Sequence, residues 1–190
     1  INVISGLYRP DGGAIRFEGR SIGGLASHRL VHAGINRTFQ IPRPFLTLTV
    51  RQNIEIASAY GRNSDGPADV EALLVSLDLA AVAGQPAGEL NSAQQKMLDL
   101  GRALATGPRL LLIDELAAGL NPAELERVAH KLKELARSGI ALLVVEHLMG
   151  FIDQITDRII VMNAGKEIFE GRLADAFKNA QVVEVFLGDE

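Results

Sequence analysis

Two adjacent carboxylates, Asp114 and Glu115, directly follow the apolar run 110–113. Four consecutive aliphatic residues without polar alternation predict a strand buried on both faces, as in the middle of a parallel sheet. Ligands of open α/β sheets bind at the carboxyl ends of the strands. Because adjacent strand residues point to opposite faces, one carboxylate could hold a metal ion while the other handles a proton or a water molecule. By itself, such a run more often ends in a solvated acidic turn.

Other polar residues stand at comparable places along the chain. Gln40 follows a predicted strand at 34–39, and residues 90–95 open a predicted helix. His147 comes shortly after a second apolar strand at 140–145. Each of these features is a weak signal alone, but their order along the chain is a strong one.

In this order, the features resemble the ATP-binding subunits of ABC transporters, and the resemblance covers all 190 residues. Gln40 is similar to the glutamine loop, and residues 90–95 resemble the signature motif. Residues 111–115 resemble the Walker B strand with its catalytic glutamate. Residues 119–121 are similar to the D-loop, and His147 to the switch histidine.

The resemblance implies ATP and Mg²⁺ as ligands and assigns a role to each polar group. Asp114 would hold Mg²⁺, and the carbonyl oxygen of Gln40 could reach the same ion or the attacking water. Glu115 would orient and deprotonate that water. His147 would contact the γ-phosphate. The alternatives are a loop amide that binds nothing for Gln40 and a surface histidine at a strand end for His147.

The signature residues would serve ATP that a second subunit holds, because the start of a helix favours phosphate. This segment departs from the usual Leu-Ser-Gly-Gly-Gln pattern. Asn91 replaces the serine, and Ser92 and Ala93 replace the two glycines, while Gln94 is retained. The added side chains could narrow the approach of the backbone to phosphate. Asn121 of the D-loop segment is the remaining candidate nucleotide contact.

The elements that must position these groups follow from hydrophobic patterning. Turn formers precede a predicted strand at 14–19, and two prolines make 41–45 a loop. The middle of the chain is predicted to be helical from residue 49, over 69–79 and from residue 91 or 92 to 105, with a break at 63–67. The last third alternates in the βαβ manner, with strands at 110–113 and 140–145, helices at 122–138 and 149–155, an antiparallel pair at 158–163 and 166–170, and short helices at 173–178 and 181–186.

The fold that the resemblance implies is α/β. It is an incomplete P-loop NTPase (RecA-like) parallel sheet with an inserted helical subdomain and part of an antiparallel β subdomain. Residues 1–40 would supply part of the core and of the antiparallel subdomain. Residues 41–100 would form the helical subdomain with the glutamine loop and the signature. Residues 101–190 would form the RecA-like core with Walker B and the switch histidine.

Composition restricts the class of protein. A chain of 190 residues is long enough for one domain, and its net charge of −4 gives no broad basic surface, so nucleic acid is not an expected partner. No cysteine occurs, which excludes disulfides and fits a reducing compartment. No apolar run approaches the roughly 20 residues that span a bilayer. We expect a cytoplasmic protein, bound peripherally at the inner face of the cell membrane.

The phosphate-binding loop G-x-x-x-x-G-K-[ST] occurs nowhere in the sequence. In the family, this loop lies just before a helix whose last turns resemble residues 1–6. We therefore expect a fragment of a longer protein that binds ATP weakly and does not hydrolyse it. Since the missing strand is central in the family's sheet, we also expect residues 1–40 to be rearranged, oligomeric or partly disordered.

Four segments resemble the ATPase subunit of branched-chain amino acid importers: 37–45, 47–50, 117–122 and 185–188. The partners implied are a second ATP-binding subunit, identical or different, transmembrane permease subunits and, indirectly, a periplasmic amino-acid-binding protein. Related systems for uptake of urea or other amides and amino acids, or for lipopolysaccharide export, remain alternatives. So do a non-transport ABC ATPase and a degenerate binding module that does not hydrolyse ATP.

Overall fold

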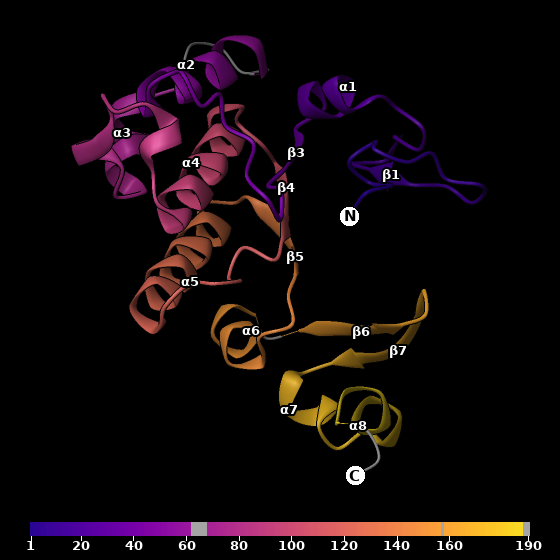
Figure 1. Cartoon of the computed structure of the whole chain (residues 1–190). Helices are drawn as coiled ribbons and strands as arrows, with labels where there is room; N and C mark the ends of the chain where they lie inside the picture. Colours follow the sequence, from indigo (N-terminus) through magenta and orange to yellow (C-terminus); the bar gives the residue numbers. More distant parts are fainter. Residues whose placement is uncertain (62–67, 157, 188–190) are drawn as a thin grey trace. The chain divides into compact units, whose positions relative to one another are not determined.

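The computed structural model describes residues 1–61, 68–156 and 158–187 (Figure 1). The chain divides into two compact units, Ile1–Glu146 and His147–Glu190, and each is described by itself. The predicted helix break at 63–67 and Gly188 of the last resembling segment lie outside the described residues. The division predicted from sequence into three parts remains a prediction.

A parallel sheet forms the centre of the first unit. Among the described residues it has the order β3 (Ile35–Arg37), β4 (Leu110–Asp114) and β5 (Ala141–Val145). Leu111 lies beside Asn36 on one side and beside Leu142 on the other. The three central side chains of β4 are fully buried, which confirms the buried strand predicted from its unbroken aliphatic run.

Helices of the first unit pack against this sheet. Helix α4 contacts β3, α2 and α3, and α5 contacts β5 (Figure 1). The buried side chains of α4 include Leu98, whereas Met97, expected to face inward, is only half-buried. The described helices of this unit are α1 (Ser27–His32), α2 (Val50–Gly61), α3 (Val70–Ser76), α4 (Ser92–Ala105) and α5 (Pro122–Arg137), with 3-10 turns η1 (Ala80–Val82) and η2 (Ala87–Glu89).

The first forty residues differ from the prediction in where their regular structure lies, since α1 was not predicted and the predicted strands are longer than the observed ones. Residues 1–5 form hydrogen-bonded turns that end at Gly6, whose φ is +74°. The strand predicted at 14–19 is wrong in length. Within it only β1 (Arg16–Phe17) is a strand, and β1 pairs antiparallel with β2 (Arg20–Ser21), which lies beyond the predicted range. The reason is a tight hairpin turn at residues 18–19, where both φ angles are positive (+48° and +76°).

The second unit is a hairpin covered by short helices. Strands β6 (Ile159–Asn163) and β7 (Lys166–Gly171) pair antiparallel through the predicted turn at residues 164–165. Val161, Ala176 and Val182 form its small core. The helices are α6 (Met149–Ile155), α7 (Leu173–Ala176) and α8 (Ala180–Leu187).

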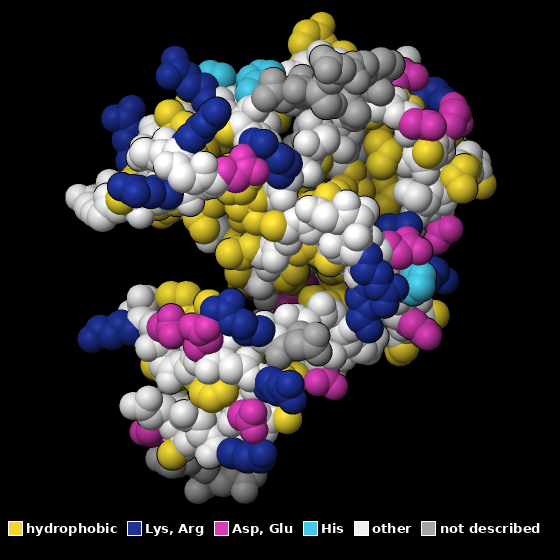
Figure 2. Space-filling view, turned by 180° about the vertical axis from the view of Figure 1, so that it is seen from behind, with side chains coloured by type: hydrophobic (Ala, Val, Ile, Leu, Met, Phe, Trp, Pro, Cys, Tyr) yellow, Lys and Arg dark blue, Asp and Glu magenta, His cyan; other side chains and the backbone are white. Residues whose placement is uncertain are grey.

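The surface is mixed in charge and carries some hydrophobic side chains. On the face that Figure 2 shows, both basic and acidic side chains occur, and hydrophobic side chains reach the surface in several places. Within the described ranges, no helix combines the length and apolarity that crossing a bilayer requires.

Candidate functional site

The carboxyl end of β4 carries the two predicted carboxylates. Directly after Asp114 the chain turns out of the sheet, because Glu115 adopts a left-handed backbone conformation with φ +47°. Its N–H still donates to the carbonyl of Val145 at 3.0 Å, which ties this turn to β5. Left-handed backbone at a residue other than glycine is uncommon and is concentrated at functional sites.

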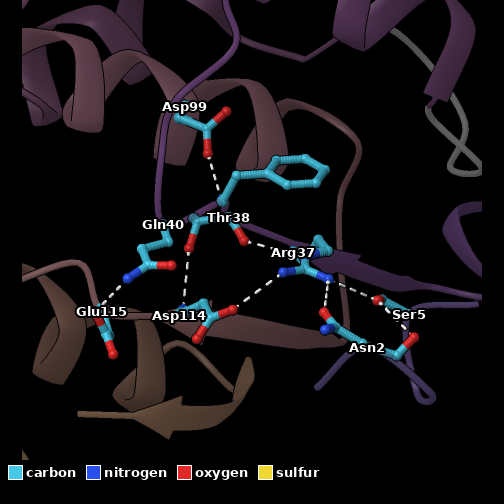
Figure 3. Close-up of polar contacts among 9 residues, drawn as sticks. Asn2, Ser5, Arg37, Thr38, Gln40, Asp99, Asp114 and Glu115 are labelled. Atoms are coloured by element: carbon cyan, nitrogen blue, oxygen red, sulfur yellow. Dashed lines mark hydrogen bonds and ion pairs between the residues drawn. The ribbon is translucent and has the colours of Figure 1, made fainter. Parts of the chain in front are cut away.

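Asp114 is paired with a nearly buried arginine at the end of β3 (Figure 3). Arg37 Nη2 lies 3.1 Å from Asp114 Oδ2, and the Arg37 side chain is 9% exposed. Arg37 Nη1 also donates to Asn2 Oδ1 at 2.8 Å and to Ser5 Oγ at 2.9 Å. The guanidinium therefore connects the first turn of the chain to the carboxylate at the end of β4. Sequence reasoning did not single out Arg37 as a site residue.

Glu115 has a different partner. Gln40 Nε2 donates to Glu115 Oε2 at 2.6 Å. With its amide nitrogen used in this way, Gln40 directs its carbonyl oxygen away from Glu115 (Figure 3). The structure thus brings Gln40, Asp114 and Glu115 together at one edge of the sheet, with each carboxylate held by a separate group.

A buried lysine from α4 holds the backbone that follows Glu115. Lys96 Nζ donates to the carbonyl of Leu116 at 2.9 Å, to that of Glu115 at 3.5 Å and to that of Ala118. Its burial lowers the pKa of Lys96, and the neighbouring carboxylates of Glu146 and Glu115 oppose that change. Sequence reasoning missed this residue.

A buried carboxylate from the same helix holds the backbone just before Gln40. Asp99 Oδ2 accepts the N–H of Phe39 at 2.8 Å, and Asp99 Oδ1 lies 3.6 Å from Arg102. Burial raises the pKa of Asp99, while the Phe39 hydrogen bond and Arg102 act in the opposite direction. Asp99 was also missed. No local pattern points to Asp99, because a charged residue inside a helix is normally assigned to the solvent face.

The signature residues begin α4 through a capping box. Asn91 is the N-cap, and its Oδ1 accepts the N–H of Gln94 at 2.9 Å, while Gln94 Oε1 accepts the N–H of Asn91 at 3.1 Å. Ser92 is exposed and Ala93 half-buried. The cap uses the carbonyl oxygen of Asn91, so its amide nitrogen is the atom that could donate to phosphate.

Asn121 begins α5 through the same kind of capping box. Its Oδ1 accepts the N–H of Glu124 at 3.0 Å, and Glu124 Oε2 accepts the N–H of Asn121 at 2.8 Å.

Glu146, at the end of the first unit, accepts the N–H of Ala117 at 2.7 Å and so supports the loop after Glu115. His147 opens the second unit, and its contact with phosphate remains a prediction.

The residues present fit a magnesium ion of the kind found beside nucleotides. Mg²⁺ prefers oxygen ligands and usually takes one or two carboxylates together with phosphate oxygens and water. Because Asp114 Oδ2 accepts from Arg37 and the Gln40 amide nitrogen donates to Glu115, the oxygens that could bind the ion are Asp114 Oδ1 and the side-chain carbonyl oxygen of Gln40. Over the described ranges, no group of three or more His, Cys, Asp or Glu side chains gathers as an all-protein metal site.

Comparison with known proteins agrees with this arrangement. The profile of the ABC transporter family matches residues 1–118. A probable branched-chain amino acid transport ATP-binding protein, LivG, from Archaeoglobus fulgidus is 36% identical over 99% of this chain and 79% of its own length. The high-affinity branched-chain amino acid transport ATP-binding protein BraF from Pseudomonas aeruginosa is 32% identical, with 99% and 81% covered.

Solved structures confirm the expected fold. A nucleotide-free ATP-binding cassette from an ABC transporter matches with a TM-score of 0.87 at 31% identity, covering 99% of this chain and 82% of that one. A cassette in the ADP conformation matches with a TM-score of 0.85 at 32% identity and the same coverage. The α/β fold is that of P-loop NTPases, and the chain belongs to the ABC transporter family.

Proposed function

We propose that this chain is the nucleotide-binding subunit of an importer that couples Mg-ATP binding and hydrolysis to uptake of branched-chain amino acids. The observation that carries the proposal is the contact of Gln40 with Glu115, at 2.6 Å, beside Asp114 at the carboxyl end of β4. Phosphoryl transfer needs mostly positioning and charge neutralisation, and this edge offers oxygen ligands beside a general base.

Within this proposal each residue has a stated task, and Gln40 has two. Asp114 and the carbonyl of Gln40 hold Mg²⁺, which when bound neutralises charge on the phosphates. Glu115 accepts a proton from the attacking water, and the Gln40 amide fixes the direction of that carboxylate. His147 contacts the γ-phosphate.

The residues at the starts of α4 and α5 serve nucleotide that a second ATP-binding subunit holds. These are Asn91, Ser92, Ala93 and Gln94 of the signature and Asn121 of the D-loop, each near a helix start where free N–H groups favour phosphate. The other partners are transmembrane permease subunits and, through them, a periplasmic amino-acid-binding protein. The place of action is the inner face of the cell membrane. The names of the LivG and BraF relatives support the substrate class.

We also propose that tight binding and hydrolysis need a phosphate loop, which these 190 residues do not contain. Titration calorimetry with Mg-ATP tests this by comparing the 190-residue chain with a longer one in which about 40 residues with the loop precede Ile1. We expect binding only by the longer chain. Equal binding by both would show that the nucleotide site is built differently.

Hydrolysis by the longer chain then tests Glu115. Glu115→Gln should lower kcat roughly a hundredfold to ten-thousandfold and retain ATP binding, because a general base contributes about that much to rate. Glu126→Gln, an exposed position on α5, is the matched control. Hydrolysis that survives Glu115→Gln would contradict the role, and Mg²⁺-dependent hydrolysis by the 190-residue chain would contradict the need for the loop.

A further inference from the structure

Helix α4 carries two charged side chains that are almost completely buried. Lys96 is 6% exposed and Asp99 is 5% exposed, and they lie three residues apart, on one side of the helix. Burying a charge is costly unless the group is hydrogen-bonded. The hydrogen-bond partners of these two charged groups therefore identify the backbone segments that α4 fixes in place.

The partners of Lys96 are the backbone carbonyls directly after Glu115. An ammonium group has three donors, and three carbonyls accept from it: those of Glu115, Leu116 and Ala118. Because Glu115 has a left-handed backbone, its side chain direction depends on the path of this turn. Lys96 binds the backbone of this turn from the side of α4.

Besides Arg102 on its own helix, the partner of Asp99 is the N–H of Phe39, one residue before Gln40. Thr38, the residue before that, is still tied to the sheet, since its N–H donates to the carbonyl of Leu112 at 2.9 Å. Asp99 thus fixes the backbone of the residue that directly precedes Gln40.

We propose that Lys96 and Asp99 are positioning residues: one fixes the backbone at Glu115, the other fixes the backbone at Gln40, and together they hold these two side chains in contact. A single rigid helix thereby sets the distance between two loops that are 75 residues apart in the sequence. The inference rests on the proposed function for the importance of that contact, but the backbone bonds exist independently of it.

Hydrogen exchange of the 190-residue chain tests the lysine without nucleotide. Lys96→Met keeps an unbranched stem and removes the ammonium, so amides 117–120 should exchange on the order of tenfold faster. Lys96→Arg keeps a cation with several donors and should restore most of the protection. Lys133→Met, at an exposed position on α5, should leave these amides unchanged.

The aspartate is tested at the other loop. Asp99→Leu removes the acceptor and should raise exchange at the Phe39 amide on the order of tenfold, whereas Asp99→Asn keeps an acceptor oxygen and should not. In a form of the protein that hydrolyses ATP, Lys96→Met should lower kcat on the order of tenfold and leave KM for ATP unchanged.

Three results would overturn the proposal. The first is unchanged exchange at 117–120 in Lys96→Met. The second is an equal increase in the exchange rate of amides across α4 and β4, since that would mean that the variant destabilises the whole core. The third is failure of both conservative variants to restore protection. Because exchange needs no ATP, a failure here is distinct from a failure of the proposed function.

Discussion

Arg37 and Gln40, three residues apart at the end of β3, each take one of the two carboxylates that end β4. Separate tasks for Asp114 and Glu115 were expected from strand alternation. In the structure the separation has a different cause, because Glu115 has already left the strand and its backbone is left-handed. The two carboxylates differ in their surroundings because they have different hydrogen-bond partners, and not because strand alternation points them to opposite faces.

Asp99 allows a prediction about pH and stability. Burial raises its pKa in the folded chain, so the stability linked to its proton is fully present below the unfolded pKa, about 4, and is lost as pH rises through the raised folded pKa. Asp99→Asn keeps an acceptor for the Phe39 N–H and cannot ionise. The melting temperature of the variant relative to the parent should therefore rise between about pH 4 and pH 7. A relative melting temperature that falls over this range would contradict the assignment.

Sequence reasoning reached some site residues and missed others for a physical reason. Gln40, Asp114 and Glu115 end or follow predicted strands, and parallel strands bring their carboxyl ends to one edge. Lys96 and Asp99 lie inside a helix, where pattern reading assigns charged residues to the solvent face. Their burial depends on carbonyls and an N–H from loops distant in sequence, which no local pattern contains.

At the scale of elements, the two helices that begin in candidate nucleotide-binding segments are capped identically. Asn121→Ala removes the side chain that accepts the Glu124 N–H, and should lower the free energy of unfolding by about 1 kcal/mol in urea titrations. Asn121→Asp keeps the acceptor and should cost little. A loss in Asn121→Ala of only a few tenths of a kcal/mol would show that the cap contributes little to stability.

Most strands and helices could be predicted from pattern, the short helices α6, α7 and α8 among them, but α1 could not. The strand predicted at 140–145 agrees with β5 to within a residue, because its apolar run is unbroken. Helix α1, six residues long with Leu30 as its buried residue, gives no measurable periodicity and was not predicted. Ser27 at its start bonds the carbonyl of Ser5 at 2.8 Å, a contact over 22 residues of sequence.

At the scale of the whole molecule, the order of motifs predicted the fold better than any single element did. Gln40, the signature, Asp114 with Glu115, and His147 each gave a weak signal, yet their order matched a family whose solved members align over 99% of the chain. Composition alone left many α/β folds open, since 47% hydrophobic and 22% charged residues are ordinary values.

The exposed face of β5 leads to a prediction about association. Parallel strands are normally covered on both faces, yet Leu143 is 38% and Val145 45% exposed, and within the described residues β5 pairs only with β4. An uncovered apolar face beside an unpaired strand edge favours contact with a second copy of the chain. Sedimentation velocity should show self-association that grows with concentration, and Leu143→Lys should reduce it because a buried ammonium is costly. Ile160→Lys, at a similarly exposed position on β6, is the control and should leave it unchanged. A monomeric parent at every concentration would show that β5 is not a contact between copies.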